Sequence, residues 1–479
     1  MKRIEANVGD SRLCHHCVGE IELKKKIKEG GRMATCSFCD QRRKTISINQ
    51  AADMFDVVFK QNFVRTDDEP TDMEYTMARE GDYEWERSGE DILNLLQEIG
   101  GIEPEVAEPI RQLLHDKHFD FEESKMGMES EFAPDSMYKP RDVDSGDFHS
   151  EWRSFEESLK TRSRYFSRRT SLILLNLFNG IHRSTTAGNR SVILKAGPGT
   201  AITSVFRARV FQDEGKLIKA LERPDLEVGP PPSAFAAAGR MNARGISVFY
   251  GAVDREIALS EVRPFVGSRV ITSKFDLLRS IFLLDLEALR EVTAKGSLFG
   301  SNYRYGLAKA DFLRSLSQKM TEPVMPDTEA FDYLPTQVIA EYLASQVTPR
   351  LDGILYPSSQ AGDGKNNIVL FHEASLVERM SDSSDTAIIA ETGMQTADGF
   401  EPDYWVFERN ASDYEPDGAS SEAVKVPTPT ANHPTGEERI PTLRIDLSSL
   451  VVHHIEGVSY SHSDFNVHRT GKNIGSRER

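Results

Sequence analysis

Cysteine is scarce in this sequence. Only four occur among 479 residues, and all of them lie before position 40. A cysteine nucleophile in the rest of the chain is therefore excluded. Long hydrophobic runs are absent as well, since the nearest, "SLILLNLFNGI" at 171–181, falls short of the roughly 18 apolar residues of a membrane helix. The N-terminus also lacks the apolar core of a secretory signal, so we expect a soluble, cytoplasmic protein with no membrane partner.

Several motifs of well-known enzyme classes are missing. The sequence contains no G-x4-G-K-[ST] phosphate loop, no G-x-S-x-G elbow, no H-E-x-x-H pair and no internal repeat. What remains is an ordinary globular mixture, with 39% hydrophobic and 28% charged residues. A chain of this length predicts two to four domains and a large core.

Charge is distributed unevenly along the chain, whose formal net charge is −17. Residues 1–50 hold 11 Lys/Arg against 6 Asp/Glu, whereas residues 67–151 hold 26 Asp/Glu against 7 Lys/Arg. A basic head could meet nucleic acid, and the acidic stretch could meet a basic partner. Solvated surface explains the same pattern, so charge alone selects no partner.

The four cysteines form two matched pairs. "CHHC" at 14–17 and "CSFC" at 36–39 are separated by eighteen residues. Each pair can supply two thiolates from one tight turn, and two such turns close a tetrahedral site. We therefore predict a structural Zn2+ held by Cys14, Cys17, Cys36 and Cys39 in a ribbon spanning residues 1–50, with short hairpins around Gly30 and Gly31. Redox-active dithiols are the alternative, and His15 or His16 could replace one ligand.

Helical periodicity dominates the next part of the chain. "AADMFDVVFK" at 51–60 spaces its apolar residues as one helix face does. Similar patterns predict helices at 89–100, 103–116 and 147–181. We expect a helical domain over residues 51–188.

From about residue 189 the pattern changes to β-branched runs and Gly/Pro turns. Helices alternate with strands there without a βαβ repeat, which indicates an α+β fold. Strands are predicted at 245–250, 351–357, 366–372 and 447–461, and helices at 255–263 and 335–347.

One helix of this region carries an unusual carboxylate. Asp254 is a good N-cap for the helix at 255–263, and Pro264 suits its end. Glu261 falls at the edge of the apolar stripe formed by Ile257, Ala258 and Val262. A carboxylate near a buried face requires a partner. The available cations are Arg207, Arg209 and Arg240, and a structural salt bridge is the simplest interpretation of any one of them.

Taken together, five ordered blocks resemble the RES domain, a family named for its Arg, Glu and Ser. They are "VFRARV", "GRMN", "VFYGAVDREIALSEVR", "YLPTQVIAEYL" and "LDGILYPSSQAGDGKNNIVLF", between about residues 191 and 375. The resemblance implies an N-terminal zinc ribbon and helical domain followed by an α+β domain similar to ADP-ribosyltransferases. That RES domain would span residues 189–468, with insertions at 211–239, 290–330 and 376–440 and a tail at 469–479.

The resemblance also implies site residues. The family's arginines fall on Arg207 and Arg240, its tyrosine on Tyr250, its glutamate on Glu261 and its serine on Ser358. Ser359 competes with Ser358, and Arg209 competes with Arg207. Glu261, Arg240, Tyr250 and Ser358 would be catalytic, and Arg207, Arg240, Tyr250 and Ser359 would bind NAD+ as substrate.

Members of this family act as toxins of toxin–antitoxin pairs, so an antitoxin protein is an expected partner. They hydrolyse or phosphorolyse NAD+, or transfer its ADP-ribose to a protein acceptor. We expect an NAD+-degrading enzyme that cleaves the nicotinamide–ribose bond, with protein ADP-ribosylation as the alternative. A nucleic-acid-binding adaptor that uses the zinc ribbon is the alternative of another class.

The N-terminal part resembles the HEPN/RES N-terminal extension of longer RES proteins. Its ribonuclease motif is an Arg followed by a His with four to six residues between them. Arg111 and His115 do not match it, because only three residues lie between them. We therefore expect no RNA cleavage by this part.

Overall fold

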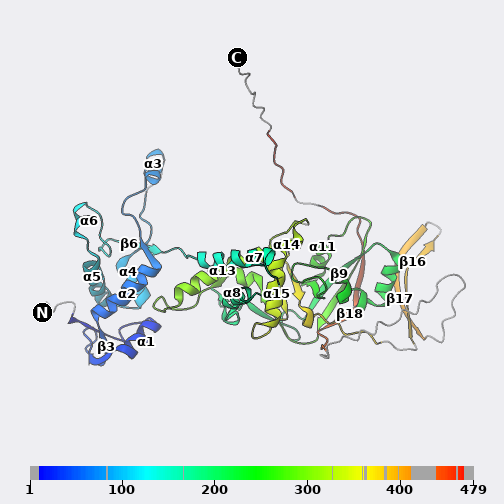
Figure 1. The fold of residues 1–479 in the computed structure, drawn as a ribbon, viewed down its shortest axis with the longest axis horizontal. Helices are drawn as coiled ribbons and strands as arrows, with labels where there is room; N and C mark the ends of the chain where they lie inside the picture. The colour runs from blue at the N-terminus through cyan, green and yellow to red at the C-terminus, as the bar shows by residue number, and fades with distance from the viewer. Residues whose placement is uncertain are drawn as a thin grey trace, which may run out of the picture. The chain divides into compact units, whose positions relative to one another are not determined.

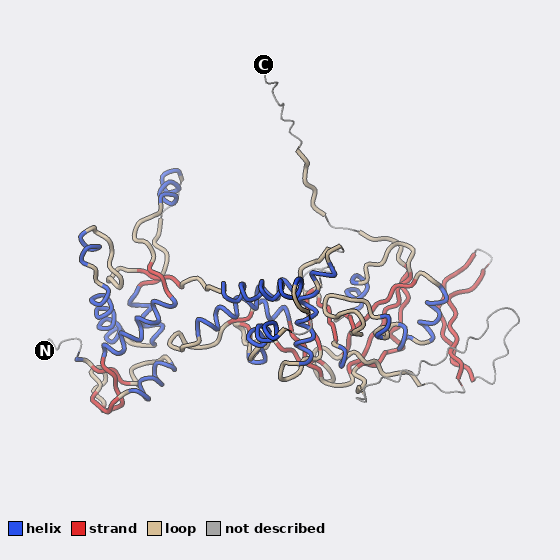
Figure 2. Tube along the Cα trace, viewed as in Figure 1, coloured by secondary structure: helices blue, strands red, loops and turns tan. Residues whose placement is uncertain are grey.

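The computed structural model describes residues 10–81, 85–164, 167–325, 327–358, 360, 364–381, 386–396, 399–410, 439–459 and 462–468. Two compact units share the chain. One contains Met1–Val192 and Glu287–Met320, and the other contains Ile193–Leu286 and Thr321–Arg479. Both helices and strands are abundant (Figure 2), which confirms the α+β class. Among the described residues, no helix combines the length and the apolar character that a bilayer crossing requires.

The first unit begins with a small antiparallel sheet of order β1-β3-β2. Its elements are β1 (Arg12–Cys14), α1 (Ile21–Gly30), β2 (Arg32–Thr35) and β3 (Arg42–Ser47). Strands β2 and β3 form an expected short hairpin. The helix α1 lies between β1 and β2, and the Glu20 side chain caps it by accepting a hydrogen bond from the Leu23 N–H. Gly31 ends this helix where a Cβ would lie 2.4 Å from the Ile27 carbonyl oxygen, so only glycine fits there.

A helical core follows the small sheet. The predicted helices are confirmed, with the ends shifted, as α2 (Ile48–Asn62), α4 (Ile92–Gly100) and α5 (Pro104–His118). Short helices α3 (Asp72–Glu80) and α6 (Phe121–Lys125) accompany them. The strands β4 (Phe63–Arg65), β5 (Glu90–Asp91) and β6 (Met137–Pro140) form a second three-stranded sheet. These strands were not predicted, because runs of two to four residues are too short to show an alternating pattern.

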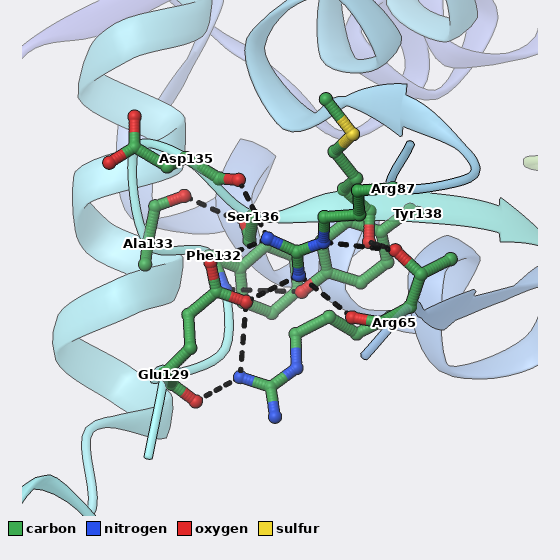
Figure 3. Close-up of polar contacts among 10 residues, drawn as sticks. Arg65, Arg87, Glu129, Phe132, Ala133, Asp135, Ser136 and Tyr138 are labelled. Atoms are coloured by element: carbon green, nitrogen blue, oxygen red, sulfur yellow. Dashed lines mark hydrogen bonds and ion pairs between the residues drawn. The ribbon is translucent and has the colours of Figure 1, made fainter. Parts of the chain in front are cut away.

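A polar cluster fastens a long loop to this second sheet (Figure 3). Arg87 donates two hydrogen bonds to the Glu129 carboxylate, at 2.9 and 2.6 Å, and further ones to the main-chain oxygens of Thr66 and Asp135. Arg65 also donates to the main-chain oxygen of Glu129. Glu129 raises the pKa of Arg87 through their hydrogen bond and ion pair. The cluster therefore ties the loop before β6 to β4.

The rest of the first unit is a helical group. The region predicted as one helix at 147–181 is divided into α7 (Gly146–Thr161) and α8 (Arg168–Phe178). The chain returns later with α13 (Tyr303–Thr321), and Trp152 of α7 packs against Phe155 and Phe312. The remaining elements are η2 (Ile181–Arg183), β7 (Thr185–Thr186), α12 (Leu286–Arg290) and β13 (Val292–Thr293), of which β7 and β13 pair. Residues 290–330, predicted as an insertion in the RES domain, thus contribute to the first unit up to Met320.

The second unit is built on an eight-stranded sheet of order β18-β11-β9-β10-β15-β14-β12-β8. Among the strands described in this sheet, only β12 and β14 pair in parallel. The strands are β8 (Ile193–Ala196), β9 (Ser204–Phe211), β10 (Phe249–Ala252), β11 (Arg269–Leu277), β12 (Ile281–Asp285), β14 (Gly353–Pro357), β15 (Asn366–Leu370) and β18 (Leu443–His454). The predicted strands correspond to β10, β14, β15 and β18, although β10 begins four residues after the expected start at 245.

Helices and a hairpin complete the second unit. They are α9 (Glu214–Glu222), α10 (Pro224–Glu227), η3 (Ser233–Phe235), α11 (Arg255–Glu261), α14 (Glu329–Asp332), α15 (Leu334–Ser345), η4 (His372–Ala374) and the hairpin β16 (Thr386–Thr396) with β17 (Gly399–Asn410). Helix α11 packs on β9, β10 and β11, and its position near β9 is marked in Figure 1. Its buried residues Ile257 and Ala258 join a small apolar cluster with Ala208, Ala252 and Val270. The sheet and this cluster fix the position of the last residue of α11.

Candidate functional site

Glu261 is the last residue of α11 and is exposed. The Asp254 side chain accepts a hydrogen bond from the Ile257 N–H at 2.9 Å, which confirms the expected N-cap. Two residues after Glu261, Arg263 turns the chain with a φ of 43°, a left-handed conformation that few non-glycine residues adopt. The helix therefore ends sharply, and Glu261 stands at that end.

The Glu261 carboxylate is held by two buried residues of the sheet region. Its Oε2 accepts a hydrogen bond from Asn367 Nδ2 at 2.9 Å and a longer one from the Ser358 hydroxyl at 3.5 Å. Asn367 is 1% exposed and Ser358 is 6% exposed. Within the described part of the chain, no arginine pairs with Glu261, so the expected structural salt bridge is not what holds it.

Ser358 follows β14, and the structure fixes the direction of its hydroxyl. The Ser358 oxygen accepts a hydrogen bond from the Gln360 N–H at 3.2 Å, which leaves its proton for Glu261. The Ser358 main chain is tied to Lys365 by an N–H···O bond of 2.7 Å. Ser359 lies outside the described residues.

Arg240 lies on a turn that several groups hold by its backbone. The Thr336 hydroxyl donates to the Arg240 carbonyl oxygen at 2.5 Å, and Gln337 Nε2 donates to the Gly239 carbonyl oxygen at 2.8 Å. The guanidinium stacks over the Tyr333 ring at 5.5 Å and donates to the Glu322 carbonyl oxygen at 2.6 Å. The main chain and the guanidinium of Arg240 are therefore both held in place by contacts within the protein.

Tyr250 belongs to β10, and its hydroxyl reaches the same turn. The hydroxyl accepts a hydrogen bond from the Met241 N–H at 3.0 Å and donates to Asn242 Oδ1 at 2.9 Å. Burial raises the pKa of Tyr250 to about 12, so the hydroxyl keeps its proton at neutral pH. Tyr250 thus ties β10 to the residue that follows Arg240.

Tyr356 lies on β14 and was missed by the sequence reasoning. Burial, together with the charges of Tyr250 and Glu261, raises its pKa well above the usual value, while Arg240 acts in the opposite direction. Glu261, Arg240 and Tyr250 therefore all act electrostatically on this one hydroxyl. Alternation along β14 could have indicated Tyr356, because it precedes Ser358 by two positions.

The two arginines of β9 have different surroundings. Arg207 donates to the carbonyl oxygens of Val228 and Tyr250 at 2.8 and 2.6 Å, and desolvation followed by repulsion from Arg209 lowers its pKa to about 10. Arg209 donates to the Glu227 carbonyl oxygen and pairs with the Glu227 carboxylate at 3.6 Å. Arg207 is therefore joined to the site through the main chain of Tyr250.

The four cysteines lie together in the first unit. Their Sγ atoms all lie within 4.8 Å of one another, and the Cys14–Cys39, Cys14–Cys17 and Cys17–Cys36 separations are 3.6, 3.7 and 3.9 Å. Four thiolates bound at about 2.3 Å in a tetrahedron are separated by about 3.8 Å, whereas a disulfide needs about 2.05 Å. The set therefore fits a tetrahedral metal ion. The first cysteine pair lies at the end of β1, and the second lies in the loop between β2 and β3.

One spacing in the first unit was overlooked. His118 has six residues between it and Arg111, which satisfies the HEPN spacing that His115 fails. Arg111 is occupied by the Glu108 carboxylate, at 2.9 and 2.7 Å, and by the Phe132 carbonyl oxygen. His118 contacts Asp56 at 2.8 Å. The expectation of no RNA cleavage stays a prediction.

Comparison with known proteins identifies two regions. The RES domain model matches residues 219–388, and the model of HEPN/RES N-terminal domain 1 matches residues 29–172. Arg240, Tyr250, Glu261 and Ser358 lie inside the first match, and Arg207 lies before it. No curated protein and no solved structure matches the chain.

Proposed function

Because the chain belongs to the RES-domain proteins with a HEPN/RES N-terminal extension, we propose that it cleaves the nicotinamide–ribose bond of NAD+ by hydrolysis or phosphorolysis. The family supports a toxin-type function related to NAD+, and the proposal adds the reaction and its residues. The observation that carries it is the Glu261 carboxylate, exposed at the end of α11 while Asn367 and Ser358 hold one of its oxygens.

Cleavage of this bond passes through an oxocarbenium-like transition state, as glycoside cleavage does. The nicotinamide leaves as a neutral molecule because it is cationic in the substrate, so no general acid is required. Positive charge moves onto the ribose, and a fixed anion beside that ring stabilises the transition state more than the substrate. Glu261 supplies this anion and accepts a hydrogen bond from a ribose hydroxyl.

The substrate's pyrophosphate requires cationic donors, and a guanidinium offers several in a planar fork. Arg240 takes this role, since Tyr250, Thr336 and Gln337 hold the backbone of its turn by hydrogen bonds. The Tyr250 ring stacks on the nicotinamide or holds the ribose while its hydroxyl keeps the turn in place.

The remaining residues support this arrangement. Ser358 orients Glu261, and Ser359 is assigned to NAD+ binding. Arg207 acts on the site through the Tyr250 carbonyl oxygen that it binds. In the first unit, Zn2+ bound by Cys14, Cys17, Cys36 and Cys39 has a structural role, because four thiolates leave no open position for a reacting water.

The proposal is tested by incubating purified protein with NAD+, with and without inorganic phosphate, and separating the products. Free ADP-ribose indicates hydrolysis, its phosphorylated form that appears only with phosphate indicates phosphorolysis, and ADP-ribose attached to an added protein indicates transfer. If no nicotinamide is released under any of these conditions, the proposal is wrong. RNA binding with a steep salt dependence would then favour the adaptor. As a toxin-type enzyme, the protein is also expected to be held inactive by an antitoxin protein.

A further inference from the structure

We propose that Asn367 is the positioning residue of this site, which fixes the orientation of the Glu261 carboxylate. The inference rests on the proposed function, because it assigns a role in the same reaction. It concerns a residue that acts through Glu261 and does not itself contact the substrate.

The position of Asn367 is rigid. It is the second residue of β15, and its backbone neighbours are Ala252 on β10 and Tyr356 on β14. Two hydrogen-bonded strands therefore flank it, and its side chain is almost fully buried. A group mounted on the central strands of a sheet is located more precisely than one on a loop.

Glu261 needs such a support. It is exposed at the C-terminal end of a seven-residue helix, where the helix dipole disfavours a negative charge. Without a partner, its long side chain would be free to adopt several rotamers in solvent. The bond from Asn367 Nδ2, at 2.9 Å, has the ordinary length of an N–H···O hydrogen bond. The Ser358 contact, at 3.5 Å, is longer than a normal O–H···O bond, so Asn367 provides the stronger hold.

The amide oxygen of Asn367, Oδ1, supports the same assignment. Its Oδ1 is buried and finds no hydrogen-bond donor among the described residues. An ionised carboxylate only accepts hydrogen bonds, so Nδ2 must face Glu261 and Oδ1 must point away from it. A buried acceptor without a donor is rare and requires an explanation. The requirement to present Nδ2 to Glu261 supplies one.

The chemistry also favours an amide over a cation. A hydrogen bond donated to a carboxylate stabilises its ionised form. A lysine or arginine in the same place would do so too, but its charge would cancel the field that the positive ribose needs. The neutral amide keeps that field. It binds only Oε2, and no other hydrogen bond to Glu261 exists among the described residues, so Oε1 is available to the substrate.

The test is Asn367→Asp, which keeps the shape and replaces the donor by a second carboxyl group. Two adjacent carboxyl groups share a proton, so one of the two pKa values rises. We expect kcat at pH 7 to fall on the order of 10²-fold, with KM for NAD+ changing little. Activity should recover as the pH rises through the raised pKa. The control is Asn94→Asp, the same change at an exposed position in the first turn of α4, which should keep the wild-type pH profile. An unchanged profile in Asn367→Asp would overturn the inference.

A second measurement does not depend on turnover. The 13C signal of the Glu261 side-chain carboxyl, assigned by its loss in Glu261→Gln, gives the pKa of this group directly. This signal should titrate at a higher pH in Asn367→Asp than in the wild type. If the wild type releases no nicotinamide while this shift is present, the proposed function fails and the assigned contact stands. If the wild type is active and the shift is absent, the role of Asn367 is wrong.

Discussion

The residues of the candidate site divide into those whose charges the proposed reaction uses and those that hold the backbone. Arg240 and Glu261 carry the charges that the proposed reaction uses. Arg207, by contrast, gives two of its donors to carbonyl oxygens. A pKa lowered to about 10 by desolvation reflects this protected environment. Arg207 is therefore expected to contribute mainly to stability.

Replacing Arg207 tests this expectation. In Arg207→Lys, a single ammonium cannot reach both the Val228 and the Tyr250 carbonyl oxygens that the planar guanidinium bridges. We expect the free energy of unfolding to fall by about 1.5–3 kcal/mol, the value of a hydrogen bond to a charged group, measured by urea denaturation. Arg209→Lys, on the same strand and with 42% of its side chain exposed, is the control and should cost less than about 1 kcal/mol. Equal losses in both variants would contradict the assignment.

The sequence indicated some of these residues and not others, for physical reasons. Glu261 was recognisable because a carboxylate at the edge of an apolar helix stripe is unusual. Asn367 gave no such signal, since an asparagine at the start of a strand resembles an ordinary turn residue. Its importance depends on a contact across 106 positions of the chain, which spacing along the sequence cannot show.

The ends of helices and strands were likewise predictable only where the sequence shows the contact that sets them. Helix α11 begins at its predicted N-cap, because the Asp254 side chain satisfies a free N–H at the start of the helix. Strand β10 begins later than expected, since Asn242 Nδ2 binds the Ile246 carbonyl oxygen and holds the preceding residues in a turn. The short strands β4, β5 and β6 exist through partners far away in the sequence, and the Arg87–Glu129 pair joins the loop before β6 to them.

That pair provides a prediction about the first unit. Both side chains are only 13% exposed, so Arg87→Ala leaves a nearly buried carboxylate without its main partner. Breaking a buried pair costs about 3–5 kcal/mol, and we expect a loss near the lower limit because some solvent reaches the pair. Urea denaturation followed by circular dichroism measures it. Arg162→Ala, which removes the exposed partner of Glu157, is the control with a loss below about 1 kcal/mol. A similar loss in both variants would show that the cluster does not stabilise the loop.

The chain as a whole forms two units, and each consists of two separate segments. Residues 287–320 leave the second unit and complete the first. The change of pattern along the sequence predicts a domain boundary near residue 190, because strands follow helices there. The return of the chain at 287–320 left no comparable signal, since a helix such as α13 has the same periodicity in either unit. The domain boundaries given by the sequence remain a prediction.

The metal site belongs to the first unit alone, which allows its role to be separated from turnover. We expect one Zn2+ per chain by elemental analysis, and its loss in Cys36→Ser. Hydrogen exchange should then increase across the first unit, because the helix α1 and the sheet around it lose their cross-link. Exchange in the strands around Glu261 should not change.

His15→Ala is the control for the metal site. His15 lies between Cys14 and Cys17 in the first pair, and this variant should retain the metal ion. Loss of the metal in His15→Ala would make the histidine a ligand. Full metal content in Cys36→Ser would contradict the four-cysteine site.

The most direct test of the central claim is the rate of NAD+ loss in Glu261→Gln, measured beside the wild type and Glu256→Gln. Glu256 is an exposed glutamate in the first turn of the same helix, so it controls for the substitution itself. We predict that Glu261→Gln remains folded and loses on the order of 10²–10³-fold in rate, while Glu256→Gln keeps the wild-type rate. A folded Glu261→Gln protein that consumes NAD+ as fast as the wild type would contradict the account.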